Sequence, residues 1–476
     1  MSEHTAPSHP KIKVAIAGAS GFVGRALIQK IKQDVDVIGL SRSPARTSDG
    51  VEWRQCDLFN LRQAEDGISG ADVVVYLVHS MMPSAKLTQG TFPDIDLLIA
   101  DNFARAAQKA NIKKIIYLSG MMPDEKLSKH LASRLEVERA LASHDVPCVS
   151  LRASLIIGKN GSSFEIMQKL VERLPIMICP RWTLTRTQPI NLHDVVNVIA
   201  GTIQRDDIAT GNYDIAGPDV LTYKAMMLEV ARLTGKKRLL IPIFLFSPKL
   251  SRLWVRLVTG ASRELIGPLV ESLRHTMVAR NSLIMEKLGI SPKSLTESLR
   301  ESLIESATPS PEKNLATNST GRARPEINTV YSVQRLPMKA GWTADWVTTR
   351  YASWIIKFLW PFIIVEQSPK GDLCFKFRPF TSKLDIPLLR LTFARDRSSK
   401  HRQLFYISGG LLLNSRFHPR GRFEFREVLN GEFILVAICD FVPALPWWIY
   451  KNTQAIAHLF VMTTFRHHLK CSPASK

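Results

Sequence analysis

His130 and Arg134 lie four residues apart in SKHLASRLEVERAL (128–141), a stretch whose pattern predicts a helix. A spacing of four places two side chains on one helix face, one turn apart. Ser119 precedes them, at the end of the apolar run IIYLSG. Histidine exchanges a proton near neutral pH, whereas arginine stays protonated and holds anions or hydroxyl groups. The three side chains could therefore act on a small substrate. The alternative is a solvated helix surface on which charged neighbours such as Glu138 pair for solubility.

A glycine-rich turn comes earlier in the chain. GASGFVG follows the apolar run VAIA directly and opens a predicted helix. In such a turn one glycine permits the bend, a second lets backbone amides approach a pyrophosphate, and a third lets the helix pack against the sheet, while the helix start favours the anion. We expect a dinucleotide site here, and the alternative is a strand-to-helix turn without a ligand. The expected binding residues are Gly18, Ser20, Gly21, Phe22, Val23 and Gly24.

The end of the next predicted strand, VDVIGL, indicates which dinucleotide binds. Ser41 and Arg42 follow it, at the place where a carboxylate would accept a hydrogen bond from the ribose 2′-hydroxyl of NAD. An arginine pairs instead with the 2′-phosphate of NADP. The expected cofactor is therefore NADP(H), with Arg46 as a second candidate to hold the phosphate and NAD as the alternative.

The elements that position these residues alternate regularly. Up to about residue 160, apolar runs of four to eight residues alternate with amphipathic stretches, which predicts a parallel sheet covered by helices on both faces. The runs are continuously apolar, as in strands buried on both faces. We predict an α/β fold with a Rossmann-type, doubly wound parallel sheet, and residues 161–305 predict a more helical substrate lobe.

The second part of the chain differs from the first in amino-acid composition. Residues 305–330 are rich in Pro, Ser, Thr, Asn and charge, which predicts a linker. Beyond it, aromatic runs that favour strands precede one amphipathic stretch, 447–469, with the length and spacing of a helix, which together predict an α+β domain. The predicted domains are a disordered tail at 1–10, the dinucleotide-binding domain with its lobe at 11–304, the linker at 305–330 and the α+β domain at 331–476.

The charge balance and the cysteines indicate in which cellular environment the protein works. The net charge is +21, and residues 331–476 carry 21 Lys and Arg against 9 Asp and Glu, a net charge of +12. Such a balance favours an anionic surface as a partner, but we find no signature of specific nucleic-acid binding. The six cysteines are scattered singly, which predicts a reducing cytoplasm and no metal site. No run reaches the ~20 apolar residues that span a bilayer, so we expect a cytoplasmic protein with at most peripheral contact with the inner face of the membrane.

Further candidates line the expected crevice. His79 follows the fourth predicted strand, at the edge where open α/β sheets present ligands. Phe164, Met167 and Trp182 could form an apolar substrate wall, with core packing as the alternative. His193 and Asp194 more simply start a helix, where an early acidic residue favours the dipole.

These stretches carry a family resemblance. VAIAGASGFVG, GLSR, QCDLFN and YLSG resemble the atypical short-chain dehydrogenase/reductase superfamily in its NmrA-like NAD(P)-binding branch. Later phrases such as TQPINLHDVV and YDIAGPDVLTYKAMM look like a bacterial subgroup of that branch with an extra C-terminal domain. The likeness covers roughly residues 11–300. It implies that Asp57 and Leu58 lie beside the adenine and that Leu77 and Val78 lie along the cofactor.

The resemblance also implies a role for the first group of residues. Active members carry a tyrosine and, four residues later, a lysine on this helix, with a serine at the end of the preceding strand. The matching positions here are Ser119, His130 and Arg134. The departure matters, because an arginine cannot relay a proton. A working variant would use His130 as the proton donor, Arg134 to hold a ribose hydroxyl or a phosphate, and Ser119 to donate a hydrogen bond to the substrate oxygen.

Two functions follow from this reading. The first is an NADP-dependent oxidoreductase, a reductase of an apolar carbonyl or quinone-like compound. The second is a catalytically silent NADPH-binding redox sensor or scaffold.

The α+β domain faintly resembles helix-grip domains of the SRPBCC type, which enclose an apolar ligand, and it could equally be a packed accessory domain. Its dispersed arginines could meet lipid headgroups, among them Arg416, Arg420, Arg422 and Arg426.

Overall fold

The chain folds into two compact units, which we describe from a computed structural model. The first unit contains residues 1–81 and 100–318, and the second contains 82–99 and 319–476. The residues described are 11–42, 50–78, 87–243, 260, 267, 270–307, 329–377, 386–414 and 421–472. The predicted tail at 1–10, most of the predicted linker, Arg46 and His79 lie outside them.

The core of the first unit is a seven-stranded parallel sheet, as the apolar runs predict. Its order is β12-β7-β6-β4-β1-β2-β3, in which the chain winds outward from β1 in both directions. The strands are β1 (Lys13–Ala17), β2 (Asp36–Ser41), β3 (Val51–Gln55), β4 (Val73–Tyr76), β6 (Lys114–Gly120), β7 (Cys148–Ala153) and β12 (Gly211–Ile215). The central strands are buried along almost their whole length, because helices cover both faces of the sheet; they are β1, β4, β6 and β7.

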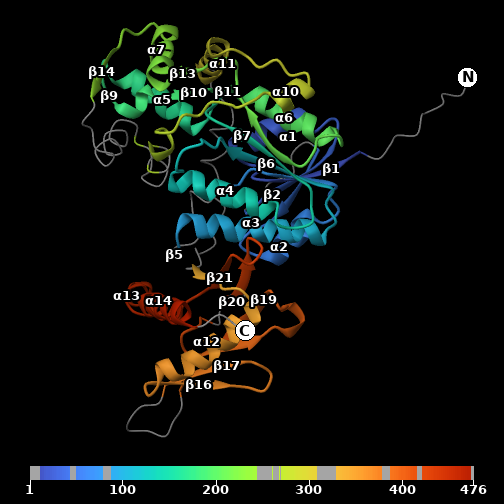
Figure 1. Cartoon of the computed structure of the whole chain (residues 1–476), viewed down its shortest axis with the longest axis vertical. Helices are drawn as coiled ribbons and strands as arrows, with labels where there is room; N and C mark the ends of the chain where they lie inside the picture. Colours follow the sequence, from blue (N-terminus) through green and yellow to red (C-terminus); the bar gives the residue numbers. More distant parts are fainter. Residues whose placement is uncertain are drawn as a thin grey trace, which may run out of the picture. The chain divides into compact units, whose positions relative to one another are not determined.

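Helices cover this sheet on its two faces, as Figure 1 shows. Two of them, α1 (Phe22–Ile31) and α6 (Leu192–Gln204), pack against each other on one face. The other face carries α2 (Leu61–Ile68), α3 (Phe92–Lys109) and α4 (Lys129–Leu141). The doubly wound parallel sheet predicted from the sequence is therefore confirmed.

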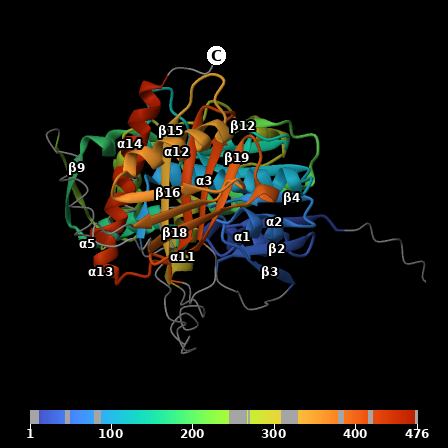
Figure 2. The ribbon, with the colours of Figure 1, turned by 90° about the horizontal axis from the view of Figure 1, so that it is seen from below.

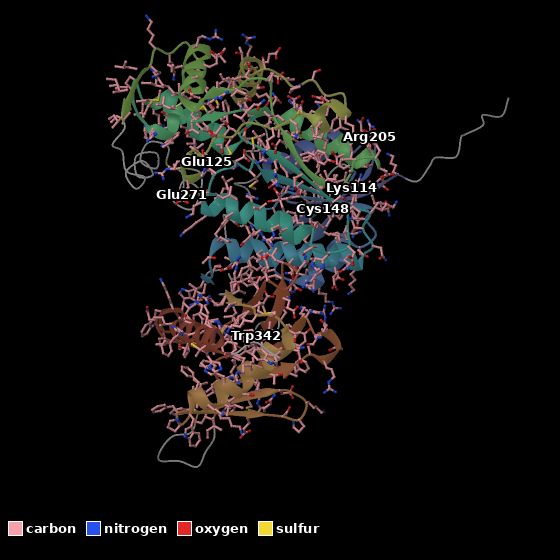
Figure 3. All side chains as sticks on the ribbon, in the orientation of Figure 1. Lys114, Glu125, Cys148, Arg205, Glu271 and Trp342 are labelled. Atoms are coloured by element: carbon pink, nitrogen blue, oxygen red, sulfur yellow. The ribbon has the colours of Figure 1, made fainter. Side chains whose placement is uncertain are left out.

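Polar contacts fix α6. Asn191 caps its start by accepting from the amide of His193 at 2.7 Å, so the predicted helix start at His193 and Asp194 is confirmed. At its other end the buried Lys114 Nζ donates to the carbonyl oxygens of Thr202 at 3.1 Å and Arg205 at 2.6 Å, where a cation favours the helix dipole (Figure 3). Burial lowers the pKa of Lys114.

A second apolar cluster forms the lobe. Phe164, Val171, Met226 and Leu299 are among its buried members. The lobe elements are α5 (Ser162–Arg173), α7 (Tyr223–Leu233), α11 (Leu295–Ala307), the 3-10 turn η1 (Arg181–Leu184), and the short strands β8 (Ile156–Ile157), β9 (Ile176–Pro180), β10 (Arg186–Thr187), β11 (Ile190–Asn191), β13 (Leu221–Thr222) and β14 (Leu239–Ile243). Its small sheets pair β10 with β13, β11 with β8 and β14 with β9. The short helix α10 (Leu283–Lys287) packs instead on the core of the parallel sheet, through Ile284 and Met285.

The second unit is a sheet of the order β16-β17-β18-β19-β20-β21-β15-β5, antiparallel except at β5. Figure 2 shows the helices α12 and α14 beside its strands. Its elements are β5 (Leu87–Gln89), β15 (Val330–Pro337), α12 (Ala344–Leu359), β16 (Ile363–Gln367), β17 (Leu373–Phe377), β18 (Ile386–Phe393), the turn η3 (Arg395–Arg397), β19 (Arg402–Gly409), β20 (Gly421–Val428), β21 (Phe433–Phe441), α13 (Trp447–Asn452) and α14 (Gln454–Cys471).

Aromatic rings join the helices to this sheet. Tyr351 of α12 lies 5.3 Å from Phe425 of β20 and 5.1 Å from Phe465 of α14, measured between ring centroids. Trp354 lies 5.1 Å from Phe465. Antiparallel strands that hold a long C-terminal helix agree with the predicted α+β class, and the rings pack the space between that helix and the strands.

The second unit includes a segment from the N-terminal half of the chain. β5 pairs in parallel with β15, and Asp94 accepts from Arg335 Nε at 2.7 Å. Gln89 Nε2 donates to the carbonyl of Ala455 in α14 at 3.0 Å. The predicted domain at 11–304 was continuous, whereas in the structure residues 82–99 leave it for the second unit.

Two further expectations for the second unit need correction. The predicted single helix over 447–469 is two helices, because the backbone of Thr453, with φ −129° and ψ −83°, interrupts it between α13 and α14. Arg426 cannot reach lipid headgroups, because it is buried against Glu424, and Arg422 is partly buried and ion-paired to Asp440. Arg416 and Arg420 lie outside the described residues.

These buried charges hold one another in their ionised forms. Burial would raise the pKa of Glu424, but the nearby guanidinium groups of Arg426, Arg402 and Arg422 outweigh it and hold that pKa at about 2. Arg402 and Arg426 both donate to its carboxylate at 2.7 Å.

Among the described residues, no helix combines the length and apolar composition that a bilayer crossing requires.

Acid should destabilise the second unit through His458. Burial lowers the pKa of His458 to about 4, so below the ordinary pKa the unfolded chain binds a proton that the folded chain excludes. The free energy of unfolding should fall by up to about 3 kcal/mol as the pH drops from about 7 to about 4. Denaturation followed by tryptophan fluorescence measures this, because six of the nine tryptophans lie between residues 342 and 448. His458→Gln should flatten the dependence, and His467→Gln, at an exposed position of the same helix, should not.

Candidate functional site

The turn between β1 and α1 leaves no room for side chains at two glycines. Gly18 has φ +87°, and its carbonyl accepts from the amide of Gly21 at 2.9 Å. A Cβ on Gly24 would lie 2.3 Å from that carbonyl oxygen. The start of α1 therefore packs directly on the turn, and its first residue is preceded by a glycine without a side chain to cap the helix amides.

A cavity of about 520 Å³ opens at this turn. It lies at the carboxyl ends of β1, β4 and β6, where open α/β sheets bind ligands. Among the predicted site residues, it is lined by Gly18, Gly21, Phe22, Val23, Gly24, Leu77, Ser119, His130 and Arg134. The glycine turn and the three candidate catalytic residues, about 100 positions apart in sequence, thus share one cavity.

The other predicted cofactor residues do not line this cavity. Arg42 is exposed at the carboxyl end of β2, and its carbonyl accepts from Gln55 Nε2 at 3.2 Å. Ser41 is the last residue of that strand, which neighbours β1 in the sheet. After β3, the side chain of Asp57 accepts from the amide of Phe59 at 3.1 Å. Leu58 is buried, and its carbonyl accepts from the side chain of Asn102 at 2.7 Å. Ser20 is exposed and Val78 is partly buried.

Arg134 is almost completely buried on α4. Its side chain is 9% exposed and Nη1 donates to the hydroxyl of Tyr117 at 3.4 Å. His130, one turn earlier, is partly exposed and also faces the cavity. The helix begins at Ser128, whose side chain accepts from the amide of Leu131, so His130 sits in the first turn.

Ser119 takes part in a buried network. Its hydroxyl donates to Glu138 Oε1 at 2.6 Å, and Arg152 Nη2 donates to Glu138 Oε2 at 2.6 Å. Glu138 is 4% exposed, so the alternative of a solvated surface pair is wrong for this residue. A serine hydroxyl has a single hydrogen, and in this arrangement it is directed at Glu138 and not into the cavity. Toward the cavity Ser119 can therefore accept a hydrogen bond.

Sequence reasoning missed a second helix start at the cavity. Asn160, Gly161, Ser162 and Ser163 line it where α5 begins. A Cβ on Gly161 would lie 3.0 Å from the ring of Phe22, so the starts of α1 and α5 pack through one aromatic side chain. The glycines in GKNGSSF were a signal that could have indicated this helix start.

Tyr223 was also missed. It begins α7, is 6% exposed and lines the cavity. Burial raises its pKa to about 12, so the phenol stays protonated at neutral pH and can donate a hydrogen bond. Its sequence neighbourhood is an ordinary capped helix start, with Thr222 accepting from the amide of Ala225, and it gave no signal of a site.

The predicted apolar wall is present in part. A smaller cavity of about 40 Å³ is lined by Met167 and Trp182, together with Tyr223, which also lines the larger one. Phe164 is instead packed in the lobe core at 1% exposure. Apolar surface therefore adjoins the larger cavity on the side of Tyr223.

The sequence matches a family model and resembles a curated protein. Residues 18–169 match a family model described as NAD(P)H-binding. Auxiliary protein GraX of Staphylococcus aureus (strain NCTC 8325 / PS 47) is 35% identical over 126 residues, 26% of this chain and 41% of GraX. The chain thus spans about two fifths of the length of this curated relative.

Solved structures share the fold. A nucleoside-diphosphate-sugar epimerase from Staphylococcus aureus has a TM-score of 0.50 at 16% identity, covering 61% of this chain and 100% of its own. The triphenylmethane reductase of Citrobacter sp., in complex with NADP(H), has a TM-score of 0.50 at 16% identity, covering 61% of this chain and 99% of its own. At these identities the likeness shows a Rossmann-like fold.

Gly24→Ala should abolish dinucleotide binding. The added methyl group would meet the Gly18 carbonyl oxygen at 2.3 Å and the Ala19 backbone at 2.8 Å, so α1 must move away from the turn. We expect NADPH affinity to fall at least about 100-fold, measured by calorimetric titration, because a misplaced helix start loses its amide contacts. Gly409→Ala is the control, since its methyl group would meet only Arg390 at 3.9 Å. Equal affinities for Gly24→Ala and wild type would contradict the assignment.

Proposed function

We propose that the chain is an NADP(H)-dependent reductase of an apolar carbonyl or quinone-like compound, since residues 18–169 match a family model described as NAD(P)H-binding. The observation that carries the proposal is the single cavity into which the glycine turn, His130 and Arg134 all open. Its volume, about 520 Å³, lies within the range of ligand clefts.

The residues present fit a dinucleotide. The close approach of Gly24 to Gly18 leaves the first amides of α1 at the cavity, and these hold a pyrophosphate. Leu77, which Gly18 contacts, is in place to lie along the cofactor. When bound, the nicotinamide supplies the hydride. Arg42, which directly follows β2 beside β1, is our candidate to hold the 2′-phosphate that distinguishes NADP from NAD.

The proposal assigns the proton to His130 and the anchoring to Arg134. His130 is partly exposed to the cavity, so it can take a proton from solvent and pass it to the substrate oxygen as a general acid. Arg134, buried beside it, stays charged and holds a ribose hydroxyl or a phosphate oxygen.

Ser119 takes a different role in this scheme from the one expected. While its hydrogen is engaged by Glu138, it accepts from a ribose or substrate hydroxyl and does not donate. The neutral phenol of Tyr223 is then the second donor available to the substrate oxygen. Leu155, Leu273 and Met277 line the same cavity and favour an apolar substrate.

A redox sensor or scaffold that binds NADPH without turnover is the second candidate. The engagement of Ser119 by Glu138 favours it, as does an arginine where a lysine would relay protons. Tight NADPH binding without oxidation against a broad panel of carbonyls and quinones would support this candidate over the reductase.

His130→Ala should lower the turnover of NADPH oxidation by about 10²–10⁴-fold, the usual contribution of a positioned general acid. NADPH affinity should change little, because the amides of α1 supply most of it. Steady-state kinetics and calorimetry separate the two effects. Lys129→Ala, at the exposed preceding position, is the matched control. Full turnover by His130→Ala would show that His130 is not the proton donor.

Arg42→Ala should weaken NADPH binding by about 10-fold or more and leave NADH binding nearly unchanged, because only NADP carries the phosphate that the guanidinium would pair with. Parallel titrations with both nucleotides measure the difference. Arg62→Ala removes an exposed arginine from α2 and serves as the control. An unchanged ratio of the two affinities would assign the selection to another residue.

A further inference from the structure

The second unit exposes large apolar side chains that lie at one end of its sheet. Scattered single exposures are normal, but a contiguous group marks an interaction site. We call this group the apolar end. It consists of Trp360, Phe362, Leu411, Trp448, Ile456 and Phe460, with exposed fractions from 56% to 71%.

Backbone pairing brings the members near the strands together. Ile363, the first residue of β16, pairs with Phe377 of β17, and Phe377 pairs with the first residue of β18. The amide of Leu411 donates to the carbonyl of Pro387, the next residue of β18, at 3.0 Å. Phe362 and Leu411 therefore lie at the same end of the sheet, linked through Phe377, which is itself 40% exposed.

The helices bring the other members to this end. The ring of Phe460 in α14 lies 6.1 Å from that of Phe358 in the last turn of α12, and Trp360 ends this helix. The amide of Ala444, just before α13, donates to the carbonyl of Leu412 at 3.0 Å, which holds the tryptophan-bearing start of α13 beside the turn after β19. α13 and α14 lie together at one side of the unit in Figure 1, drawn in red.

The charge at this end is positive. The described segments that form it, 354–364, 375–377, 386–390, 407–414 and 441–464, contain no Asp or Glu but contain Lys357, Lys376, Arg390 and Lys451. Two described carboxylates lie within two residues of these segments, and both are ion-paired, Glu366 to Lys376 and Asp440 to Arg422, each at 2.6 Å. The described acidic residues Asp345, Asp372, Asp396, Glu427 and Glu432 belong to the opposite end of the unit.

We propose that the apolar end docks on the surface of an anionic phospholipid bilayer. Tryptophan side chains settle at the level of the headgroups, because an apolar ring there carries a polar N–H. Phenylalanine and leucine side chains bury their apolar surface at the boundary between headgroups and acyl chains. The lysines lay their aliphatic chains along the apolar surface and place their ammonium groups among the lipid phosphates. Each ammonium group adds an electrostatic attraction that weakens as the salt concentration rises. This inference is independent of the proposed reduction, since it concerns only the second unit.

Charge argues against a second copy of the chain as the occupant. A two-fold contact would place the same surface on both sides, so the lysines of the apolar end would face one another without carboxylates between them. Like charges opposed in this way disfavour association. A bilayer that contains anionic lipid supplies both the apolar layer and the opposite charge.

Co-sedimentation of the full chain with vesicles tests the proposal. We expect binding to an equal mixture of phosphatidylcholine and phosphatidylglycerol, at least about 10-fold weaker binding to phosphatidylcholine alone, and loss of binding in high salt. The double variant Trp360→Ser and Phe362→Ser should lower the partition coefficient at least about 10-fold, since each ring loses its apolar contact. Lys357→Glu with Lys451→Glu should remove the preference for the anionic vesicles while leaving the apolar surface intact.

Leu283→Ser with Ile304→Ser is the matched control, because these side chains are 59% and 62% exposed in the first unit. Circular dichroism checks that each variant folds. The proposal is overturned if the wild-type chain binds neither vesicle, if it binds both equally, or if the control loses as much binding as the aromatic variant. A concentration-dependent dimer that the aromatic substitutions dissolve, with no vesicle binding, would assign the apolar end to a second copy.

Discussion

The first unit depends on one close approach, that of the start of α1 to the turn after β1. With Gly24 packed on the carbonyl of Gly18, the helix axis points into the carboxyl edge of the sheet, and its first amides open on the cavity. The ring of Phe22, at the first position of that helix, then packs against Gly158 and Gly161 at the start of α5. A displacement of α1 would thus move the lobe as well as the turn, since one aromatic side chain separates the two helix starts.

Buried charge sets the position of α4 in the same unit. His130, Arg134 and Glu138 follow one another at intervals of four along one helix face. Glu138 is tied to Arg152 of β7 and to Ser119 of β6, and breaking a buried pair of this kind is costly because one charge is left uncompensated. The ion pair therefore fixes the rotation of the helix that presents His130 to the cavity. In the same network the hydroxyl of Ser119 donates its hydrogen bond to Glu138. The contacts that hold α4 in place therefore also determine which hydrogen bonds Ser119 can make in the cavity.

The sequence predicted what local signals determine. Apolar runs predicted the parallel strands, and glycine spacing after VAIA predicted the turn, because a strand buried on both faces and a bend without Cβ atoms leave direct marks on composition. Tyr223 could not be predicted, since only the packing of the lobe brings it to the cavity. Arg422 looked like a surface cation, because strand pairing alone brings its partner Asp440 from β21. Arg426 looked like one too, although its partner Glu424 lies two residues earlier on the same strand, because the sequence does not show that this face of β20 is buried. β5, with the unremarkable sequence LTQ, is a strand only because β15 offers it an edge.

The place of β5 has a consequence for how the protein is made. On the ribosome the segment 82–99 emerges early, long before β15 is synthesised, and its strand partner does not yet exist. The segment of β5 must therefore remain without its strand partner until β15, at residues 330–337, has been synthesised. Cutting the gene at the apparent linker would separate this segment from the sheet that it completes, so the two halves of the polypeptide are not interchangeable modules.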